Sequence, residues 1–421
     1  MQINPHWNSN GHKIVLTAFL FIGIFMPCLF KIRMQYIVLA IELLYIGWNC
    51  VKFRTIVLDK QLIKIIIAFA PFYLYYSLII LTKIGAANYG QYIVEYTQSI
   101  SIGVYVIGLG IAIHFFKRSN CYEEDLLYKM IIAVGIVQLF CVVSAFLFPS
   151  VKQFFNNLTL NNSFNETMAS WYQKQWYMSW RAYGLAENLF DGFGFIISII
   201  ISITLIYGLN NKRKSIVVLG IIMMIMPLLN ARTGLLLCLV SLVIITLNYL
   251  NPKRVLWFAA AGIVVFILFV AYFDQLPLGL KIALGDGFQD IRNLLKGEKS
   301  GVFVQILGAD IIFPEDIFFG AGISPERYAG YTGIDSGYIQ CLWRFGIFGT
   351  ALLFFGFAYS FVNIYKSNQK KEKVLVLSIA TIMLIYSFKL FLFNSYSDIF
   401  LLFVIIFCVG SGTKMNRLRI Q

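Results

Sequence analysis

The sequence predicts an all-α polytopic membrane protein, and its composition and hydrophobic pattern both point to that class. Hydrophobic residues make up 59% of the 421 residues, and charged residues only 13%. Apolar runs close to the roughly 20 residues that cross a bilayer as a helix recur along the whole chain. The short alternating segments of a membrane β-barrel are not visible in the sequence. We therefore expect a single integral membrane domain over residues 1–421.

The apolar runs place about 12 membrane-spanning helices. The predicted spans are 14–30, 34–51, 62–81, 98–116, 128–148, 190–209, 215–229, 233–250, 254–273, 337–365, 374–393 and 397–411. Two long segments remain between them, a first large loop over 149–189 and a second large loop over 274–336.

The distribution of basic residues predicts the orientation, because Lys and Arg accumulate in cytoplasmic loops. One side of the predicted helices collects clusters such as Lys212–Lys214 and Lys370–Lys373, whereas the short loops of the other side hold far fewer, among them Lys83 and Arg232. Both termini are therefore expected in the cytoplasm and both large loops outside. The net charge of +14 is then explained by topology, and no nucleic-acid partner is predicted.

The stretch from Gly320 to Gly349 contains the strongest candidate site. Arg327 lies in the polar loop, Asp335 at the predicted membrane edge and Arg344 inside the following apolar helix. A charged side chain inside lipid is costly unless it faces a bundle interior or a wet cavity. This path therefore predicts the mouth of an active site at the outer face of the membrane.

Further charged residues are expected at the same face. Arg181 precedes the sixth span and is followed by Glu187 and Asp191, and Arg232 stands at the head of the eighth span. Taken singly, each arginine could be a solvated loop charge. Taken together, several guanidinium groups suit a diphosphate, whose oxygens they bind in a bidentate fashion.

Glu42 is a further predicted intramembrane charge, in the middle of the second span. We expect it to be a salt-bridge partner of Arg344 or Lys389, with a catalytic role as the alternative.

No metal site or cofactor is predicted. All histidines, His6, His12 and His114, fall on or near the cytoplasmic side, and the scattered cysteines form no CxxC pair. Nucleotide-binding and hydrolase motifs such as a P-loop, GxSxG or HExxH are absent from the sequence.

Three short motifs carry a resemblance to a known family. They are NARTG at Asn230–Gly234, FFGAG at Phe318–Gly322 and DSGYIQCLWRFGIFG at Asp335–Gly349. Arg181 and Gly192 also fit an Arg-x10-Gly pattern, from which the second loop departs by one residue. In order and topology, the chain resembles the O-antigen polymerase (Wzy) family, within the wider polymerase and ligase superfamily.

The resemblance implies a GT-C-like, metal-independent glycosyltransferase of the bacterial inner (cytoplasmic) membrane with a periplasmic active site. Such an enzyme polymerises O-antigen or capsule-type repeat units by moving the growing undecaprenyl-diphosphate-linked glycan onto the next lipid-linked repeat unit. Membrane lipid and the chain-length regulator and flippase of the same pathway are the implied partners.

Two alternative functions stay open. An O-antigen ligase is less favoured, because that branch typically offers a histidine near the position of Asp335. A lipid-linked oligosaccharide flippase or other transporter would also explain arginines that face a cavity.

The expected roles of these residues follow from a reaction in which a diphosphate is the leaving group. Arg232 and Arg327 stabilise its growing negative charge, and Asp335 or Glu187 accepts the proton of the incoming sugar hydroxyl. The predicted substrate-binding residues are Arg181, Arg344, Tyr331, Tyr338 and Asp191.

Overall fold

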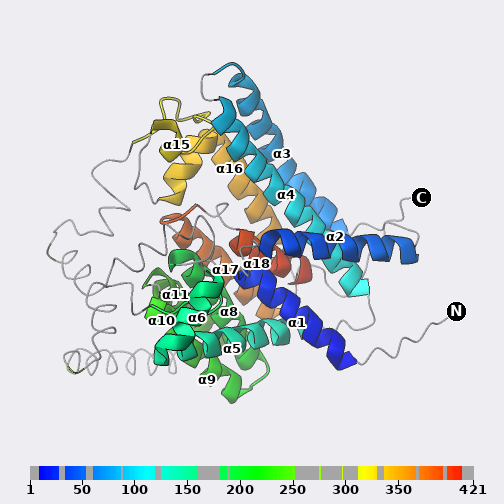
Figure 1. Cartoon of the computed structure of the whole chain (residues 1–421), viewed down its shortest axis with the longest axis vertical. Helices are drawn as coiled ribbons and strands as arrows, with labels where there is room; N and C mark the ends of the chain where they lie inside the picture. The colour runs from blue at the N-terminus through cyan, green and yellow to red at the C-terminus, as the bar shows by residue number, and fades with distance from the viewer. Residues whose placement is uncertain are drawn as a thin grey trace. The chain divides into compact units, whose positions relative to one another are not determined.

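The computed structural model of the chain is helical, with no strand among the residues that it describes (Figure 1). These residues are 9–27, 34–53, 60–86, 89–118, 125–159, 181–186, 190–230, 232–251, 312–329, 336–366, 369–391 and 396–409, with the single positions 275 and 296. Within them, five helices are long and apolar enough to cross a membrane. The chain is therefore a helical protein of membrane type, and it divides into two compact units.

The first unit comprises Met1–Gln35, Glu123–Glu298 and Leu377–Ile382. Its helices are α1 (Ser9–Phe25), α5 (Leu126–Leu147), α6 (Pro149–Thr159), α8 (Phe190–Asn210), α9 (Lys214–Met223), α10 (Ile225–Asn230) and α11 (Arg232–Tyr249). The central element is α8, which packs against α5, α9, α10 and α11. It is apolar on all sides, as a helix surrounded by other helices must be.

The contact between α8 and α11 explains a glycine of the NARTG motif. A Cβ atom on Gly234 would collide with the backbone of Gly194 in α8, so the two helices approach through a pair of glycines. Further along the same contact, the buried hydroxyls of Ser202 and Ser241 lie 2.6 Å apart. This part of the motif therefore serves helix packing.

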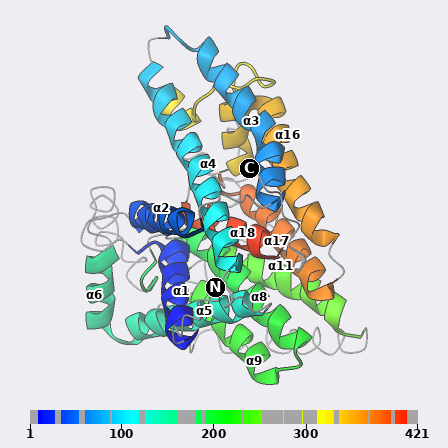
Figure 2. The same ribbon diagram turned by 90° about the vertical axis from the view of Figure 1, so that its right-hand side faces the viewer.

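The second unit comprises Tyr36–Tyr122, Lys299–Val376 and Met383–Gln421. Its helices are α2 (Met34–Phe53, which begins in the first unit), α3 (Lys60–Thr82), α4 (Tyr89–Arg118), α15 (Pro325–Ala329), α16 (Gly337–Tyr365), α17 (Lys370–Ser387, shared with the first unit) and α18 (Tyr396–Val409). Two views show α3, α4 and α16 running side by side, with α3 in contact with both others (Figure 1, Figure 2). Early and late parts of the chain thus form one core.

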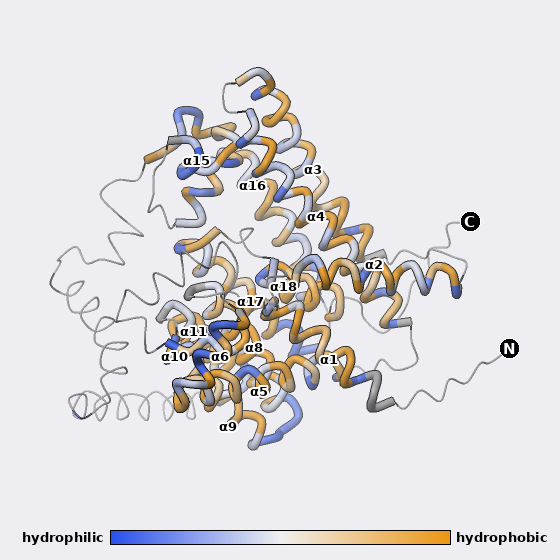
Figure 3. The backbone as a smooth tube through the Cα atoms, in the orientation of Figure 1, coloured by the Kyte–Doolittle hydropathy of each residue, from blue (hydrophilic) through white to orange (hydrophobic). Residues whose placement is uncertain are grey.

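Aromatic side chains fill the second unit. Phe72 and Tyr76 of α3 meet the ring of Phe345 edge to face, with centroids 4.9 Å apart in each pair. Phe69 and Phe357 pack in the same way at 5.2 Å. Most residues of these helices are hydrophobic, while hydrophilic residues gather around α15 (Figure 3).

Two predicted spans are interrupted in the structure. The span predicted over 337–365 is α16, which breaks at Gly346, where φ is 62° and ψ is −172°. The span predicted over 215–229 is divided into α9 and α10 at Met224. Hydropathy could not reveal either break, because apolar residues continue through both.

The fourth predicted span begins too late. We expected it over 98–116, but α4 already begins at Tyr89. The first turns are rich in polar residues, so the hydropathy pattern missed them. Of the other predictions, the span over 254–273 lies outside the described residues, and the large loops are described only over 149–159, 181–186 and 312–329 and at positions 275 and 296.

Candidate functional site

The candidate site in the second unit is built around Glu95, a buried carboxylate in the early turns of α4. Its side chain is only 5% exposed, so its charge must be compensated by close partners. The backbone N–H of Ser324 donates to both carboxylate oxygens, at 3.1 Å each. Two arginines of the second unit complete its surroundings.

Arg344 is the tightly held arginine. Its Nε donates to Oε2 of Glu95 at 2.9 Å, and its NH1 donates to Oε1 of Gln340 at the same distance. The guanidinium also lies over the ring of Phe391, 4.2 Å from the centroid, in a cation–π contact. With 11% of its side chain exposed, Arg344 is satisfied on several sides within an apolar helix.

Arg327 is the loosely held arginine. It lies on α15, with its Nε 3.7 Å from Oε1 of Glu95, and 39% of its side chain is exposed. Two guanidinium groups therefore share a single carboxylate, so these three side chains together carry one net positive charge. We call Glu95, Arg327, Arg344, Ser324 and Gln340 the Glu95 cluster.

A short segment that we call the strap, Asp316–Ser324, presents Ser324 to Glu95. The strap contains the FFGAG motif and lies along the break in α16. Ala321 donates to the carbonyl of Trp343 at 2.6 Å, and Ile347 donates to the carbonyl of Ile317 at 2.9 Å. These two bonds fasten the strap on either side of Gly346.

Two glycines make this close approach sterically feasible. Gly320 and Gly346 both have positive φ, 78° and 62°, and a Cβ atom on either would collide with the backbone of the opposite segment. The hydroxyl of Tyr75 in α3 donates to the carbonyl of Phe345 at 3.1 Å and so adds support beside the break. The two glycine-rich motifs are therefore parts of one contact.

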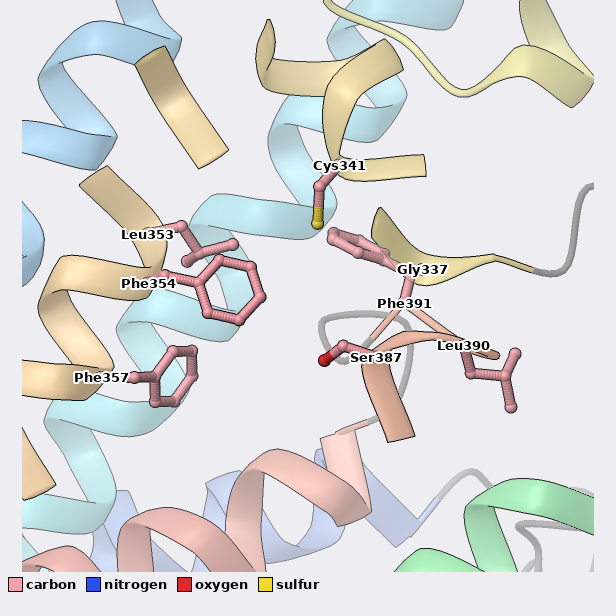
Figure 4. Close-up of a pocket in the computed structure, with 8 residues that line it drawn as sticks. All are labelled: Gly337, Cys341, Leu353, Phe354, Phe357, Ser387, Leu390 and Phe391. Atoms are coloured by element: carbon pink, nitrogen blue, oxygen red, sulfur yellow. The ribbon is translucent and has the colours of Figure 1, made fainter. Parts of the chain in front are cut away.

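Two hollows lie near this contact. An open, almost entirely apolar hollow of about 660 Å³ is lined by Tyr75, Phe319, Phe348, Ala351, Leu352 and Phe355. A second hollow of about 10 Å³ lies between the two halves of α16 and the end of α17 (Figure 4). Gly337, Cys341, Leu353, Phe354, Phe357, Ser387, Leu390 and Phe391 line it. The smaller one has room for about one water molecule.

The first unit brings the other two motifs together. The side-chain oxygen of Asn230 accepts a hydrogen bond from the N–H of Ala182 at 2.7 Å, and its carbonyl accepts one from the Tyr183 hydroxyl at 3.3 Å. Arg181 donates from NH1 to the same tyrosine hydroxyl at 3.2 Å. The segment of Arg181 therefore lies against the NARTG segment, as a shared site would require.

The predicted site residues fall into three groups. Arg327 and Arg344 come together on Glu95, and Arg181 lies beside the NARTG segment. Arg232 and Asp191 are in α11 and α8, but only their backbone is described. The predictions for Glu187, Tyr331 and Asp335 lie outside the described residues.

Tyr338 has a packing environment in α16. Its hydroxyl donates to the carbonyl of Leu384 at 2.9 Å, and its ring contacts those of Phe354 and Phe388. Contact with a sugar stays a prediction for this residue.

The predicted pairing of Glu42 with Arg344 is wrong. Arg344 pairs instead with Glu95 of α4, which the strap also contacts through Ser324. Glu42 is 1% exposed in α2, and within the described part of the chain neither of its carboxylate oxygens has a hydrogen-bond partner.

Sequence reasoning missed Glu95 because its segment was assigned to a loop. The spacing along the sequence offered a usable signal, because one helical stripe contains Tyr92, Glu95, Ser99 and Ile102. In the structure all four of these residues are buried. A glutamate that continues an apolar helical stripe predicts a buried charge with partners elsewhere.

No known protein-family model matches the chain, and no curated protein sequence matches it. The site must therefore be judged on its own chemistry. Over the described ranges, no three His, Cys, Asp or Glu side chains gather at metal-ligand spacing. The groups that the Glu95 cluster offers to a ligand are guanidinium N–H donors and one excess positive charge, which favour an anion such as a phosphate.

Proposed function

We propose that the chain is a membrane glycosyltransferase that polymerises lipid-linked oligosaccharide repeat units, as its resemblance to the O-antigen polymerase family implies. The observation that carries the proposal is the convergence of Arg327 and Arg344 on a single buried carboxylate. This arrangement supplies an anion-binding site with excess positive charge at one end of a broken apolar helix. A diphosphate on a polyprenyl carrier has the matching charge.

The apolar hollow beside the strap supports a lipid-linked substrate. Phe319 of the strap lines it, while Ser324 at the other end of the strap bonds Glu95. An ionic cluster and an apolar hollow are thus joined by one short segment. A molecule with a charged headgroup and a long hydrocarbon tail suits both.

The proposed reaction needs stabilisation of a leaving group more than it needs a strong acid. The sugar hydroxyl of the acceptor attacks the anomeric carbon of the donor, and the bond between that carbon and the diphosphate oxygen breaks. Arg327 receives the departing charge, with Arg344 fixed beneath it. Asp335 or Glu187 accepts the hydroxyl proton.

Arg181 and Arg232 of the first unit are proposed to bind the diphosphate of a lipid-linked substrate. Their support is the hydrogen bonding of Asn230 to Ala182 and Tyr183 within the first unit. A transporter or a ligase of the same class would use the same charges, so the experiment must separate the three.

The decisive experiment replaces Arg327 with Ala in the organism that carries the protein. The expected result is surface glycan that contains single repeat units only, because elongation is lost while export continues. Arg213→Ala is the matched control, since Arg213 is an exposed arginine of the first unit. The glycan ladder on a gel is the measurement, normalised to the amount of protein in the membrane.

The other outcomes each exclude the proposal. Long chains at normal protein levels in Arg327→Ala would show that the site does not elongate glycans. Loss of all surface glycan, including single units, would indicate a transporter. Full-length polymer that accumulates on its lipid carrier without reaching its final acceptor would indicate a ligase.

A further inference from the structure

We infer that Glu95 is a positioning residue. It keeps Arg344 in place, and it releases Arg327 when this arginine binds the diphosphate of the substrate. The inference rests on the proposed function for the identity of the anion. It assigns separate roles to the two arginines and makes Glu95 the internal anion with which the substrate competes.

The two ion pairs of Glu95 differ in strength and exposure. The Arg344 contact is a hydrogen bond of 2.9 Å, whereas the Arg327 contact is 3.7 Å, beyond hydrogen-bond length. The Arg344 side chain is 11% exposed and that of Arg327 is 39% exposed. A ligand that arrives from solvent therefore meets Arg327 first and finds it weakly held.

Arg344 is not available for exchange. Besides Glu95 it bonds Gln340 and lies over Phe391, so leaving its place would break three interactions at once. A buried arginine without its partners would carry an uncompensated charge, which is strongly unfavourable. Arg344 therefore stays with Glu95 whether or not substrate is bound.

Glu95 is also held in place and cannot move with Arg327 when the anion binds. The N–H of Ser324 holds both of its oxygens, and Ser324 belongs to the strap fastened across the break in α16. When an anion enters, the carboxylate keeps its position and Arg327 turns away from it. The mobile part of the cluster is a single exposed arginine side chain.

Charge balance favours this exchange. Before binding, one carboxylate faces two guanidinium groups. After binding, Glu95 and Arg344 form a neutral pair, and Arg327 pairs with a phosphate oxygen. Arg327 always has an anionic partner, so its charge is compensated in both states. The carboxylate thus lowers the affinity for the diphosphate, which also favours release of the diphosphate product.

A purely structural role for Glu95 makes a different prediction. If it only fastened α4 to the strap, Glu95→Gln would lower thermal stability and leave the anion affinity of the folded protein unchanged. In the role that we infer, Glu95→Gln keeps an acceptor for Ser324, and Arg344 keeps Gln340 and Phe391. The folded variant then binds the anion more tightly, because Arg327 has lost its competitor.

The experiment measures equilibrium binding of farnesyl diphosphate and of inorganic pyrophosphate to the purified full-length protein in detergent. We expect both probes to bind Glu95→Gln about fivefold more tightly than wild type, the size of effect expected for a partly exposed ion pair. Arg327→Gln weakens binding, and the double variant binds no more tightly than Arg327→Gln alone. Tighter binding of farnesyl diphosphate than of pyrophosphate identifies the ligand source as a lipid headgroup, and equal binding identifies a free phosphate compound.

Two further variants keep the test decisive. Glu326→Gln removes an exposed carboxylate next to Arg327 in the chain and is expected to change affinity less than twofold, because exposed charges are screened. Glu95→Asp retains the charge on a shorter side chain and is expected to bind with intermediate affinity. It replaces Glu95→Gln in the comparison if the latter does not fold.

The failures of the two proposals are distinguishable. If wild type binds the probes and folded Glu95→Gln and Glu95→Asp bind them no better, the role of Glu95 is overturned while the proposed function stands. The role of Glu95 is also overturned if Glu95→Gln still raises the affinity for the probes when Arg327 is replaced by Gln. If neither wild type nor any variant binds either probe, both proposals fail.

Discussion

The helices α8 and α16 are both apolar enough to cross a membrane, yet they differ in burial and in their polar contacts. In the most apolar window of α8, 94% of the residues are buried, against 44% for α16. The buried hydroxyls of Ser198, Ser202 and Thr204 in α8 bond within the helix, and that of Ser202 also lies 2.6 Å from the hydroxyl of Ser241 in α11. By contrast, α16 holds Arg344 and breaks at Gly346. Apolar composition alone therefore does not separate these two helices; a buried charge whose partners are remote in the chain does.

The largest effect is expected from Arg344→Ala, which removes the charge that pairs with Glu95 from within α16. Glu95 would lose its close partner while its side chain is only 5% exposed. Breaking a buried ion pair in this way costs about 3–5 kcal/mol of stability. We expect a large drop in the thermal unfolding temperature in detergent and complete loss of glycan elongation.

Arg213→Ala is the control for the loss of an arginine, because Arg213 is exposed in the first unit. It should unfold within a degree or two of wild type. Similar unfolding temperatures for the two variants would show that the Glu95 cluster does not stabilise the second unit.

The second prediction concerns the break in α16 and uses Gly346→Ala. Alanine at φ 62° and ψ −172° is strained, and its Cβ would collide with the carbonyl of Phe318 in the strap. Strain and overpacking together are expected to cost about 3 kcal/mol. Because the strap also presents Ser324 to Glu95, elongation should fall more steeply than stability alone explains.

Gly47→Ala is the matched control for this substitution. Gly47 lies in α2, and a Cβ atom added there would meet no other atom within 4 Å, so alanine fits without a clash. It should be neutral or slightly stabilising, by up to about 1 kcal/mol, since alanine is the better helix former. If Gly346→Ala behaves like this control, the strap is not fixed by the break.

The sequence predicted the helical membrane class and most helices of the structure, because long apolar runs leave few alternatives. It also singled out Arg344, from the cost of a charge inside an apolar helix, and Arg327, from its place in the polar loop that leads to this helix. It did not predict Glu95, since the polar first turns of α4 were assigned to a loop. The break at Gly346 was missed as well, because it depends on the strap, which is remote in the chain.

The pairing of charges is the step that sequence reasoning could not supply. Glu42 and Glu95 both lie in apolar helices, and spacing along the chain does not say which of them meets Arg344. The partner is decided by the contacts of α3 with α4 and α16, which bring distant segments together. Such long-range packing has no local signature.

The smallest of these effects is expected in the first unit, from Asn230→Ala. The substitution leaves the N–H of Ala182 without its 2.7 Å acceptor in a buried setting, which costs about 1–3 kcal/mol. It also frees the segment that carries Arg181, so elongation should be reduced but not abolished. The readouts are thermal unfolding and the length distribution of the surface glycan.

Asn248→Ala is the control that shows whether the loss of another asparagine side chain in the same unit has the same effect. Asn248 is an exposed residue of α11, and its side chain donates to the carbonyl of Ile244 in its own helix. Its replacement should leave both stability and chain length close to wild type. If Asn230→Ala shortens the glycan while Asn248→Ala does not, the Arg181 segment contributes to elongation from the first unit. If both variants give wild-type ladders, the site is confined to the second unit, and the contrast between the two units becomes sharper.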